Sequence, residues 1–412
     1  MTAKMVSLSS CITPTKGKPP AEMPYFGDGA EPYLSPEYLR RRGNAEPAKP
    51  AANAVRVKDG DTVLLWDGSN AGEFFRGRQG LLASTMTHLG HSKEFEPEYF
   101  CYATKRWESY LKGQTSGSGI PHVDKEVLGK LEILLLPSDE QSLVANILKT
   151  LDQAIEQTEA LIAKQQRIKT GLMQDLLTKG IDKHGNIRSE ATHAFKDSPL
   201  GRIPQEWDVS PADSLCEAVI DCKNRTPPEA AEGHPVIRTP NVRNGEFVWT
   251  DLAFTDSASY ETWTARGQPR AGDVVITREA PFGEACIIPE NLFAPCLGQR
   301  MMMYRPSANK VRADYFVYAI QSDRVQKKLL ELAGGSTVGH IRVGDIRTLP
   351  IPHPIDVKEQ ESIASVLNGV AIALKDASNS QRKFAYLKAG LMHDMLTGER
   401  RVTPLLSQAV QQ

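Results

Sequence analysis

The strongest constraint on this chain is an internal repeat. Residues 140–148, which begin with Glu140-Gln141, return in similar form at 359–367. Residues 171–178, a Gly-Leu-Met-x-Asp-x-Leu-Thr segment, return at 390–397. Both pairs are separated by 219 positions (359 − 140 and 390 − 171). A shared offset across two separate blocks indicates two copies of one structural unit.

Each copy predicts a long amphipathic helix. Proline is absent from residues 138–198 and 355–403, so no backbone donor is removed there. Leucine, isoleucine, valine, phenylalanine and methionine recur near a seven-residue rhythm, which is typical of a coiled-coil seam. These residues are Leu148, Leu151, Ile155, Ile162, Leu172 and Leu176 in the first copy, and Leu367, Val370, Leu374, Phe384, Leu391 and Met395 in the second. About forty helical residues span ~60 Å.

Polar residues at the helix starts and in the seam have predicted roles. We expect Glu140 and Glu359 to cap their own helices, with Ser138 as N-cap of the first. Contact with a partner by the same helix ends is the rival interpretation, and the two roles are compatible. Gln165 and Gln381 interrupt the apolar seam, so we expect each helix to pair with another in a fixed register.

The repeat continues upstream of the helices. Residues 60–65 match 272–277, residues 99–102 match 315–318, and residues 117–122 match 335–340. The Gly-Asp pairs at 60–61 and 272–273 predict turns into buried strands, and the Tyr-Phe-x-Tyr segments predict a helix packed on a sheet. We expect those aromatic side chains to form core rather than a base-stacking platform. The fold class is therefore mixed α/β (α+β), with two domains in tandem and an internal repeat.

These observations divide the chain into six segments. The first half lacks the Pro204-x-x-Trp207 sequence that opens the second, and begins instead with little more than Val6 and Leu8. The predicted segments are a first globular domain at 1–136, a first helix at 137–180, a linker at 181–206, a second globular domain at 207–352, a second helix at 353–400 and a tail at 401–412.

Composition limits the function only weakly. The formal net charge of −1 does not by itself indicate a nucleic-acid binder, although contact surfaces are local. The six cysteines form no CxxC pair, so we expect reduced thiols and no metal site. No apolar run is long enough to span a membrane, and no signal peptide is evident, which favours the cytoplasm.

The order and duplication of these motifs resemble the specificity subunits of type I restriction–modification systems. The resemblance rests on the Glu-Gln and Gly-Leu-Met-x-Asp blocks, their repeats, and Pro204-x-x-Trp207. It implies two target-recognition domains that each bind half of a bipartite DNA site. It also implies two conserved helices, packed as an antiparallel coiled coil, that set the spacer and dock two methyltransferase subunits. Two restriction (translocase) subunits are further expected partners.

The resemblance implies no catalysis by this chain. S-adenosylmethionine, ATP and Mg²⁺ are expected on partner subunits, and no cofactor or metal is expected here. The residues agree, because Thr226-Pro227-Pro228-Glu229 lacks the amide and the aromatic of a methyltransferase motif. No phosphate-binding GxxxxGK[ST] loop is present. The alternative function is a non-catalytic coiled-coil scaffold with two protein-binding modules, which sequence-dependent DNA affinity would distinguish.

Candidate DNA contacts are the arginine, lysine, asparagine, glutamine and serine side chains in loop-rich stretches of each domain. In the first domain they are Ser69, Asn70, Arg76, Arg78 and Gln79. In the second they are Lys223, Arg225, Arg238, Asn241, Arg243, Asn244, Arg278, Gln299 and Arg300. His122 and His340 occur in both copies, so we expect a shared role in phosphate contact or in packing.

Overall fold

The computed structural model describes residues 3–41, 43–115, 120–279, 281–335 and 339–409. The chain forms two compact units, one of residues 1–160 with 378–412 and the other of residues 161–377. Both boundaries fall inside the long helices α6 (Ser138–Leu176) and α11 (Val357–Thr397). Each unit therefore combines one globular domain with the first half of one helix and the second half of the other. The sequence predicted the two helices but not this division.

The helices run antiparallel within each unit. In the first unit Asp152 pairs with Lys388 (Oδ1–Nζ, 2.5 Å), and the Gln381 side-chain amide donates to Glu159 Oε1 (3.1 Å). Seven residues forward on α6 thus correspond to seven residues back on α11. In the second unit Leu176 of α6 belongs to the same core cluster as Ala364 of α11. The hydrogen bond from Gln381 to Glu159 confirms that this seam glutamine links the two helices.

The globular domain of the first unit is built on two sheets. Their strand orders are β2-β9-β6-β7 and β4-β3-β8-β5, and β1 pairs with β10. The strands are β1 (Lys4–Ser7), β2 (Ile12–Lys16), β3 (Glu31–Leu34), β4 (Pro47–Ala48), β5 (Arg56–Val57), β6 (Thr62–Leu65), β7 (Phe74–Arg76), β8 (Gly80–Leu82), β9 (Met86–His91) and β10 (Glu132–Leu135). The helices are α1 (Leu8–Cys11), α2 (Pro36–Arg41), α3 (Pro97–Lys105), α4 (Glu108–Gly113), α5 (Lys125–Lys130) and α12 (Thr403–Ala409).

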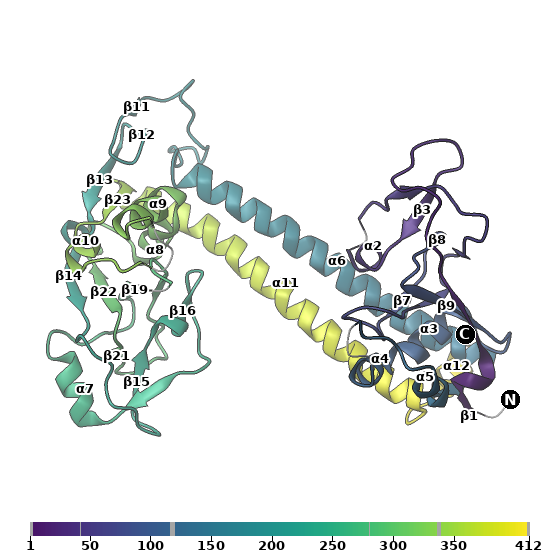
Figure 1. The fold of residues 1–412 in the computed structure, drawn as a ribbon. Coiled ribbons are helices and arrows are strands. Elements are labelled where there is room, and N and C mark those ends of the chain that lie inside the picture. The colour runs from purple at the N-terminus through teal and green to yellow at the C-terminus, as the bar shows by residue number, and fades with distance from the viewer. Residues whose placement is uncertain (1–2, 42, 116–119, 280, 336–338, 410–412) are drawn as a thin grey trace. The chain divides into compact units, whose positions relative to one another are not determined.

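The second unit repeats this plan. Its principal sheet has the order β14-β22-β19-β20, β13 pairs with β23, and a smaller sheet has the order β18-β15-β21 (Figure 1). The strands are β11 (Phe195–Lys196), β12 (Ile203–Pro204), β13 (Trp207–Pro211), β14 (Cys216–Asp221), β15 (His234–Ile237), β16 (Val242–Arg243), β17 (Glu246–Phe247), β18 (Ala253–Thr255), β19 (Val274–Thr277), β20 (Ala285–Ile287), β21 (Cys296–Leu297), β22 (Met301–Pro306) and β23 (Pro350–Pro354). The helices are η1 (Ala212–Leu215), η2 (Thr239–Asn241), α7 (Ser257–Thr264), α8 (Ala313–Gln321), α9 (Asp323–Leu332) and α10 (Val343–Arg347).

The first domain begins with a strand, β1, although it lacks the Pro-x-x-Trp sequence that leads into the first strand of the second domain. Val6 of β1 pairs with Ile133 of β10, as Val209 of β13 pairs with Pro352 of β23. Leu8, which follows β1, is fully buried and donates its backbone N–H to the Leu131 carbonyl (2.8 Å). The first domain therefore forms the same entry strand without the Pro-x-x-Trp sequence.

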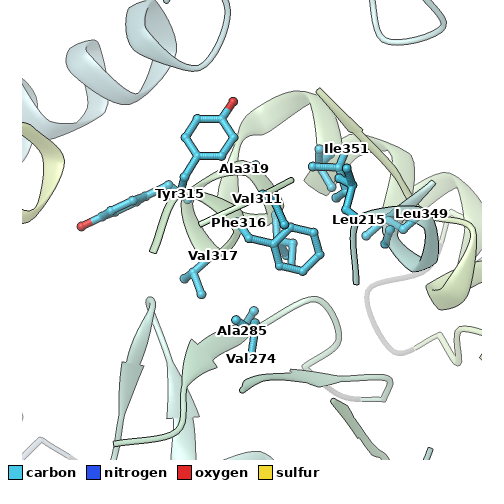
Figure 2. Packing of buried hydrophobic residues seen from close by; sticks show 14 of the residues in the cluster. Leu215, Val274, Ala285, Val311, Tyr315, Phe316, Val317, Ala319, Leu349 and Ile351 are labelled. Atoms are coloured by element: carbon cyan, nitrogen blue, oxygen red, sulfur yellow. The ribbon is translucent and has the colours of Figure 1, made fainter. Parts of the chain in front are cut away.

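The Tyr-Phe-x-Tyr segments form α3 and α8, and their aromatic side chains are core as predicted. The Tyr99 hydroxyl donates to the Leu134 carbonyl (2.7 Å), and the Tyr315 hydroxyl donates to the Pro352 carbonyl (3.0 Å). Figure 2 shows the neighbouring Phe316 among apolar residues of the sheet and of the strand that precedes α11. Each helix is thus bonded to the strand that leads into a long helix.

The glutamine of each Glu-Gln pair joins a long helix to its domain. Gln141 is fully buried; its Nε2 donates to the Glu94 and Leu136 carbonyls (2.8 and 2.7 Å) and its Oε1 accepts from the Glu96 N–H (2.8 Å). Gln360 makes the equivalent bonds in the second unit, to Lys310, Pro354 and Arg312. Both buried amides are satisfied, so they fix the start of each helix against the loop before α3 or α8.

The glutamate of each pair does not cap its own helix, contrary to our expectation. Glu140 accepts two hydrogen bonds from Arg401, which follows the end of α11 (Nη2–Oε1 2.5 Å, Nε–Oε2 2.8 Å). Glu359 accepts two from Arg188, which follows the end of α6 (Nη1–Oε1 2.5 Å, Nη2–Oε2 2.9 Å). Ser138 is the first residue of α6 and its hydroxyl donates to Glu96 Oε1 (2.9 Å). The start of each long helix is therefore tied to the chain beyond the end of the other.

Candidate nucleic-acid interface

Two candidate residues of the first domain, Arg76 and Arg78, lie at the end of β7 and just beyond it. Arg76, at the end of this strand, forms an ion pair with Glu98 of α3, and Lys149 of α6 reaches the same carboxylate (3.3 Å). Arg78 lies against Tyr38, with Nη1 3.3 Å from the hydroxyl and Cζ 5.5 Å from the ring centre. Arg76 is exposed, and both guanidinium groups are oriented by neighbouring side chains.

The remaining first-domain candidates are exposed. Ser69 and Asn70 lie in the turn between β6 and β7. Gln79 is exposed, and its backbone N–H donates to the Asp59 carboxylate (3.1 Å). These side chains are accessible to a DNA backbone or groove.

A cleft of about 570 Å³ lies between the first domain and the helices of its unit. Its walls carry basic side chains from β7 and the loop after it, and from α3, α6 and α11, interleaved with acidic ones. The basic residues are Arg76, Arg78, Lys105, Lys149 and Lys388, and the acidic ones are Asp59, Glu98, Asp152 and Glu156. Because the charges nearly balance, the cleft is not a general anion trap.

In the second domain, two of the predicted cations lie over one tryptophan. Lys223 Nζ is 5.1 Å and Arg225 Cζ is 5.2 Å from the ring centre of Trp263 on α7. The Trp263 indole N–H donates to the Arg225 carbonyl (2.9 Å), which fixes the loop to the helix. Cation–π contacts of this kind orient positive charge at a surface without neutralising it.

The predicted cluster at 238–244 divides into accessible and buried members. Asn241 is fully buried; its Oδ1 accepts from the Arg238 N–H (3.0 Å) and its Nδ2 donates to the Val248 and Thr250 carbonyls. These bonds hold the amide in the interior, so Asn241 supports the surrounding backbone instead of facing the surface. Asparagine suits turns and caps as well as base edges, so its type alone did not separate these roles.

The other members surround the hairpin of β16 and β17. Asn244 (φ 50°) and Gly245 (φ 87°) form its two-residue turn, where left-handed conformations favour these residue types. Asn244 is exposed at this turn. Arg238 Nη2 donates to the Asp251 carbonyl (2.6 Å), and Arg243 Nη1 donates to the Thr239 carbonyl (2.9 Å). The hairpin thus presents Arg243 and Asn244 on an ordered frame.

The remaining candidates lie where β19 ends and β22 begins. Arg278 is only 7% exposed, and its N–H donates to the Arg300 carbonyl (2.8 Å). Gln299 is half-buried, whereas the Arg300 side chain is 50% exposed and pairs with Glu279 (Nε–Oε2, 2.7 Å). His340 Nδ1 lies 2.9 Å from the other oxygen of that carboxylate. The structure therefore brings Arg278, Gln299, Arg300 and His340 together.

The first domain has the same backbone arrangement at this place. Trp66 donates its N–H to the Thr85 carbonyl (2.8 Å), as Arg278 does to Arg300. Asp67, the equivalent of Glu279, pairs with Lys16 (2.7 Å) and forms a β-bridge with His122. Of the repeated element at 117–122 and 335–340, residues 117–119 and 336–338 lie outside the described residues. The two histidines therefore lie beside an acidic residue in both domains.

Sequence analysis missed the acidic partners and the tryptophan. Glu98, Glu279 and Trp263 orient candidate cations, yet none was singled out. For Glu279 a signal existed, because an acidic residue follows each matched strand, at Asp67 and Glu279. For Glu98 and Trp263 no local pattern gives the pairing, which is made by the fold.

No group of three or more histidine, cysteine, aspartate or glutamate side chains among the described residues is arranged to hold a metal ion. No helix among them is both long and apolar enough to cross a membrane.

Comparison with known proteins gives the family. Residues 13–165 and 204–381 match the family model described as the type I restriction modification DNA specificity domain. The chain belongs to the type I restriction–modification specificity subunits. As in the sequence-based interpretation, the DNA specificity domain occurs twice, and each match runs into one of the long helices.

Individual specificity subunits resemble the whole chain. The MjaVIII specificity subunit of Methanocaldococcus jannaschii is 31% identical over 408 residues, covering 98% of this chain and 94% of the relative. The putative MjaX specificity subunit of the same organism is 24% identical and covers 76% of this chain and 70% of the relative. The crystal structure of the S subunit from M. genitalium has a TM-score of 0.63 at 12% identity and covers 96% of both chains. A structure from a study of type I R-M complex assembly has a TM-score of 0.53 at 18% identity, covering 95% of this chain and 97% of the other. The two solved structures share the fold of this specificity subunit.

Proposed function

We propose that each domain of this subunit recognises one half of a bipartite DNA site, and that α6 and α11 set the distance between the halves. The supporting observation is the repetition of the same Gln and Glu–Arg contacts in both units, while the polar surfaces differ. A common frame with different loops suits two similar docking geometries on two different base sequences.

The proposed contacts are the exposed or half-buried polar residues of each domain, together with Arg278, which is 7% exposed and is bonded through its backbone N–H to the exposed Arg300. They are Ser69, Asn70, Arg76, Arg78 and Gln79 in the first domain, and Lys223, Arg225, Arg238, Arg243, Asn244, Arg278, Gln299 and Arg300 in the second. Arginine, asparagine and glutamine suit base edges, and lysine and serine suit phosphates.

We further propose that the chain acts in the cytoplasm with two methyltransferase subunits and without catalysis of its own. Restriction subunits would join the same complex. S-adenosylmethionine, ATP and Mg²⁺ would then bind the partners. A docking surface for the methyltransferase is supported by Ile168 on α6 and Leu387 on α11, which are equivalent in the repeat. Their side chains are 43% and 50% exposed, so both are accessible to a partner.

Matched insertions in the two helices test the spacer. Four residues would be inserted after Ile168 of α6 and four before Ile372 of α11, because these positions continue the antiparallel register of the helices. Four helical residues add ~6 Å, close to two base-pair steps. The methylated motif of the assembled complex should keep both half-sites and gain about two base pairs between them. An unchanged spacer in an active, assembled complex would contradict the proposal.

A further inference from the structure

Glu279 lies between Arg300 and His340 at the edge of the principal sheet of the second domain. Its two carboxylate oxygens are used separately: Oε2 lies 2.7 Å from Arg300 Nε and Oε1 lies 2.9 Å from His340 Nδ1. We propose that Glu279 positions Arg300 to read a guanine in the half-site of the second domain. This inference rests on the proposed function and adds the reading residue, its positioning residue and the base.

The backbone of Arg300 supports a special role for its side chain. Its φ of 76° is left-handed, a conformation that costs free energy for a residue with a Cβ. The backbone is held there by the hydrogen bond from Arg278 N–H to the Arg300 carbonyl (2.8 Å). Strand β22 begins at the next residue, Met301, which is fully buried. A rigid strand therefore presents Arg300 at the surface in one orientation.

The side chain is prepared for a planar acceptor. Among the described residues, only Glu279 pairs with the Arg300 guanidinium, and the contact is on Nε. The two terminal Nη groups carry the other four N–H donors of the guanidinium in a fixed planar fork. Guanine offers O6 and N7 in the major groove, which is the geometry that arginine binds with two hydrogen bonds.

The nearby carboxylate favours a base over a phosphate. Glu279 is partly exposed (26%) and carries negative charge beside the guanidinium. A phosphate approaching Arg300 would bring a full negative charge close to that carboxylate, whereas the O6 and N7 acceptors of a guanine carry no net charge and are repelled less. The pair therefore suits sequence reading rather than backbone anchoring.

The first domain has the same backbone arrangement at this position but a different side chain. Thr85 occupies the position of Arg300, with the equivalent backbone hydrogen bond from Trp66. Asp67 is held there by Lys16 instead of an arginine. The frame is thus shared, and the side chain that faces outward at this position differs. Such a difference is required if the two domains read different bases.

The test uses the whole chain assembled with its methyltransferase subunits. The substrates are duplexes that contain the wild-type motif or one changed base pair in the half assigned to the second domain. Arg300→Gly removes the guanidinium and keeps the left-handed backbone, which glycine adopts readily. Glu279→Gln keeps the size of the side chain and removes its charge. Arg270→Ala is the matched control. Arg270 precedes the start of β19, whereas Glu279 follows its end, and Arg270 is likewise an exposed arginine (63%) paired with a glutamate, Glu217 (3.7 Å).

We expect Arg300→Gly to lower discrimination at one guanine position by about 5- to 150-fold and to leave the other positions unchanged. Glu279→Gln should lower discrimination at the same position by a smaller factor, and Arg270→Ala should have no effect. A position-specific change separates reading from a merely structural role, which would lower methylation of all duplexes together.

Two outcomes overturn the inference. The first is a half-site with no specified guanine, and the second is an Arg300→Gly complex with wild-type discrimination at every position. Both leave the proposed function intact, because the wild-type complex still methylates a split motif. If the wild-type complex shows no split motif that depends on this chain, the proposed function itself fails.

Discussion

Arg188 forms a two-point ion pair with Glu359, the first residue of the repeated Glu-Gln pair in the second half. The pair is buried, with side-chain exposures of 7% and 9%, and Glu359 also accepts from the Trp207 indole and the Ile181 N–H. The equivalent pair of Arg401 and Glu140 is more open on the arginine side, at 37% and 4%. The same glutamate–arginine ion pair is thus made by different segments: the linker supplies the arginine in the second unit, and the tail supplies it in the first.

Removal of the arginine from this ion pair should lower the free energy of unfolding more in the second unit than in the first. Arg188→Ala leaves Glu359 buried without its counter-charge, so we expect a loss of about 3–5 kcal/mol in the free energy of unfolding. Arg401→Ala should cost less, about 1 kcal/mol, because solvent screens the exposed arginine. Denaturant unfolding of the variants measures both values, with Arg202→Ala as an exposed control. Equal losses for the two variants would show that burial does not set the strength of these pairs.

The Arg401–Glu140 pair should also make stability depend on pH. Hydrogen bonds from Arg401 hold the pKa of Glu140 below its ordinary value. A depressed folded pKa contributes stability that is fully present above the unfolded value of about 4.3 and is lost as pH falls through the folded value. The stability difference between wild type and Glu140→Gln should therefore shrink below pH ~4.3. The exposed Glu22→Gln variant serves as control. A difference that grows on acidification would contradict this sign.

Lys223 offers a test of phosphate contact. Lys223→Ala should weaken DNA binding for all sequences and lower the slope of log affinity against log salt by about 1. The control is Arg56→Ala, an exposed first-domain arginine already paired with Glu31 by three hydrogen bonds. Affinity titrations at several salt concentrations give both slopes. A sequence-dependent loss with an unchanged slope would assign Lys223 to base reading instead.

Ile168 and Leu387 test the docking of the methyltransferase subunits. A charge at either site should remove one of the two subunits, and the double variant Ile168→Glu with Leu387→Glu should remove both. Association should fall at least about tenfold per site, because an ion would enter an apolar contact. Mass measurement of the assembled complexes gives the stoichiometry. Gln166→Glu, two residues from Ile168 and so on another side of α6, is the control. Full assembly of the double variant would place the docking surface elsewhere.

The repeat made much of the fold predictable, because matched blocks imply matched structure. The two helices, the buried strands β6 and β19, and the core role of Tyr99 and Tyr315 followed from periodicity and residue type. The roles of Glu140 and Glu359 did not, because their arginines lie 261 and 171 positions away and only the tertiary fold brings them together. Local reasoning assigned these glutamates to the nearest unsatisfied groups, which are those of their own helix ends.

The candidate site was predictable only by residue type. Arg300 and Arg243 were found because arginine suits DNA, but their orientation depends on Glu279 and on the hairpin turn. Asn241 has the same chemistry as Asn244, and only the structure shows that one amide is buried and the other residue is exposed at the turn. Whether a polar side chain faces inward depends on backbone contacts that a single sequence does not display.

The most direct test of the central claim is methylation mapping in two hosts, one with the cognate methyltransferase and this chain and one with the methyltransferase alone. The account predicts methylated adenines in a split motif that appears only when this chain is present. It also predicts that exchange of residues 207–352 for those of another specificity subunit changes one half of the motif. Identical methylation in the two hosts would contradict the account.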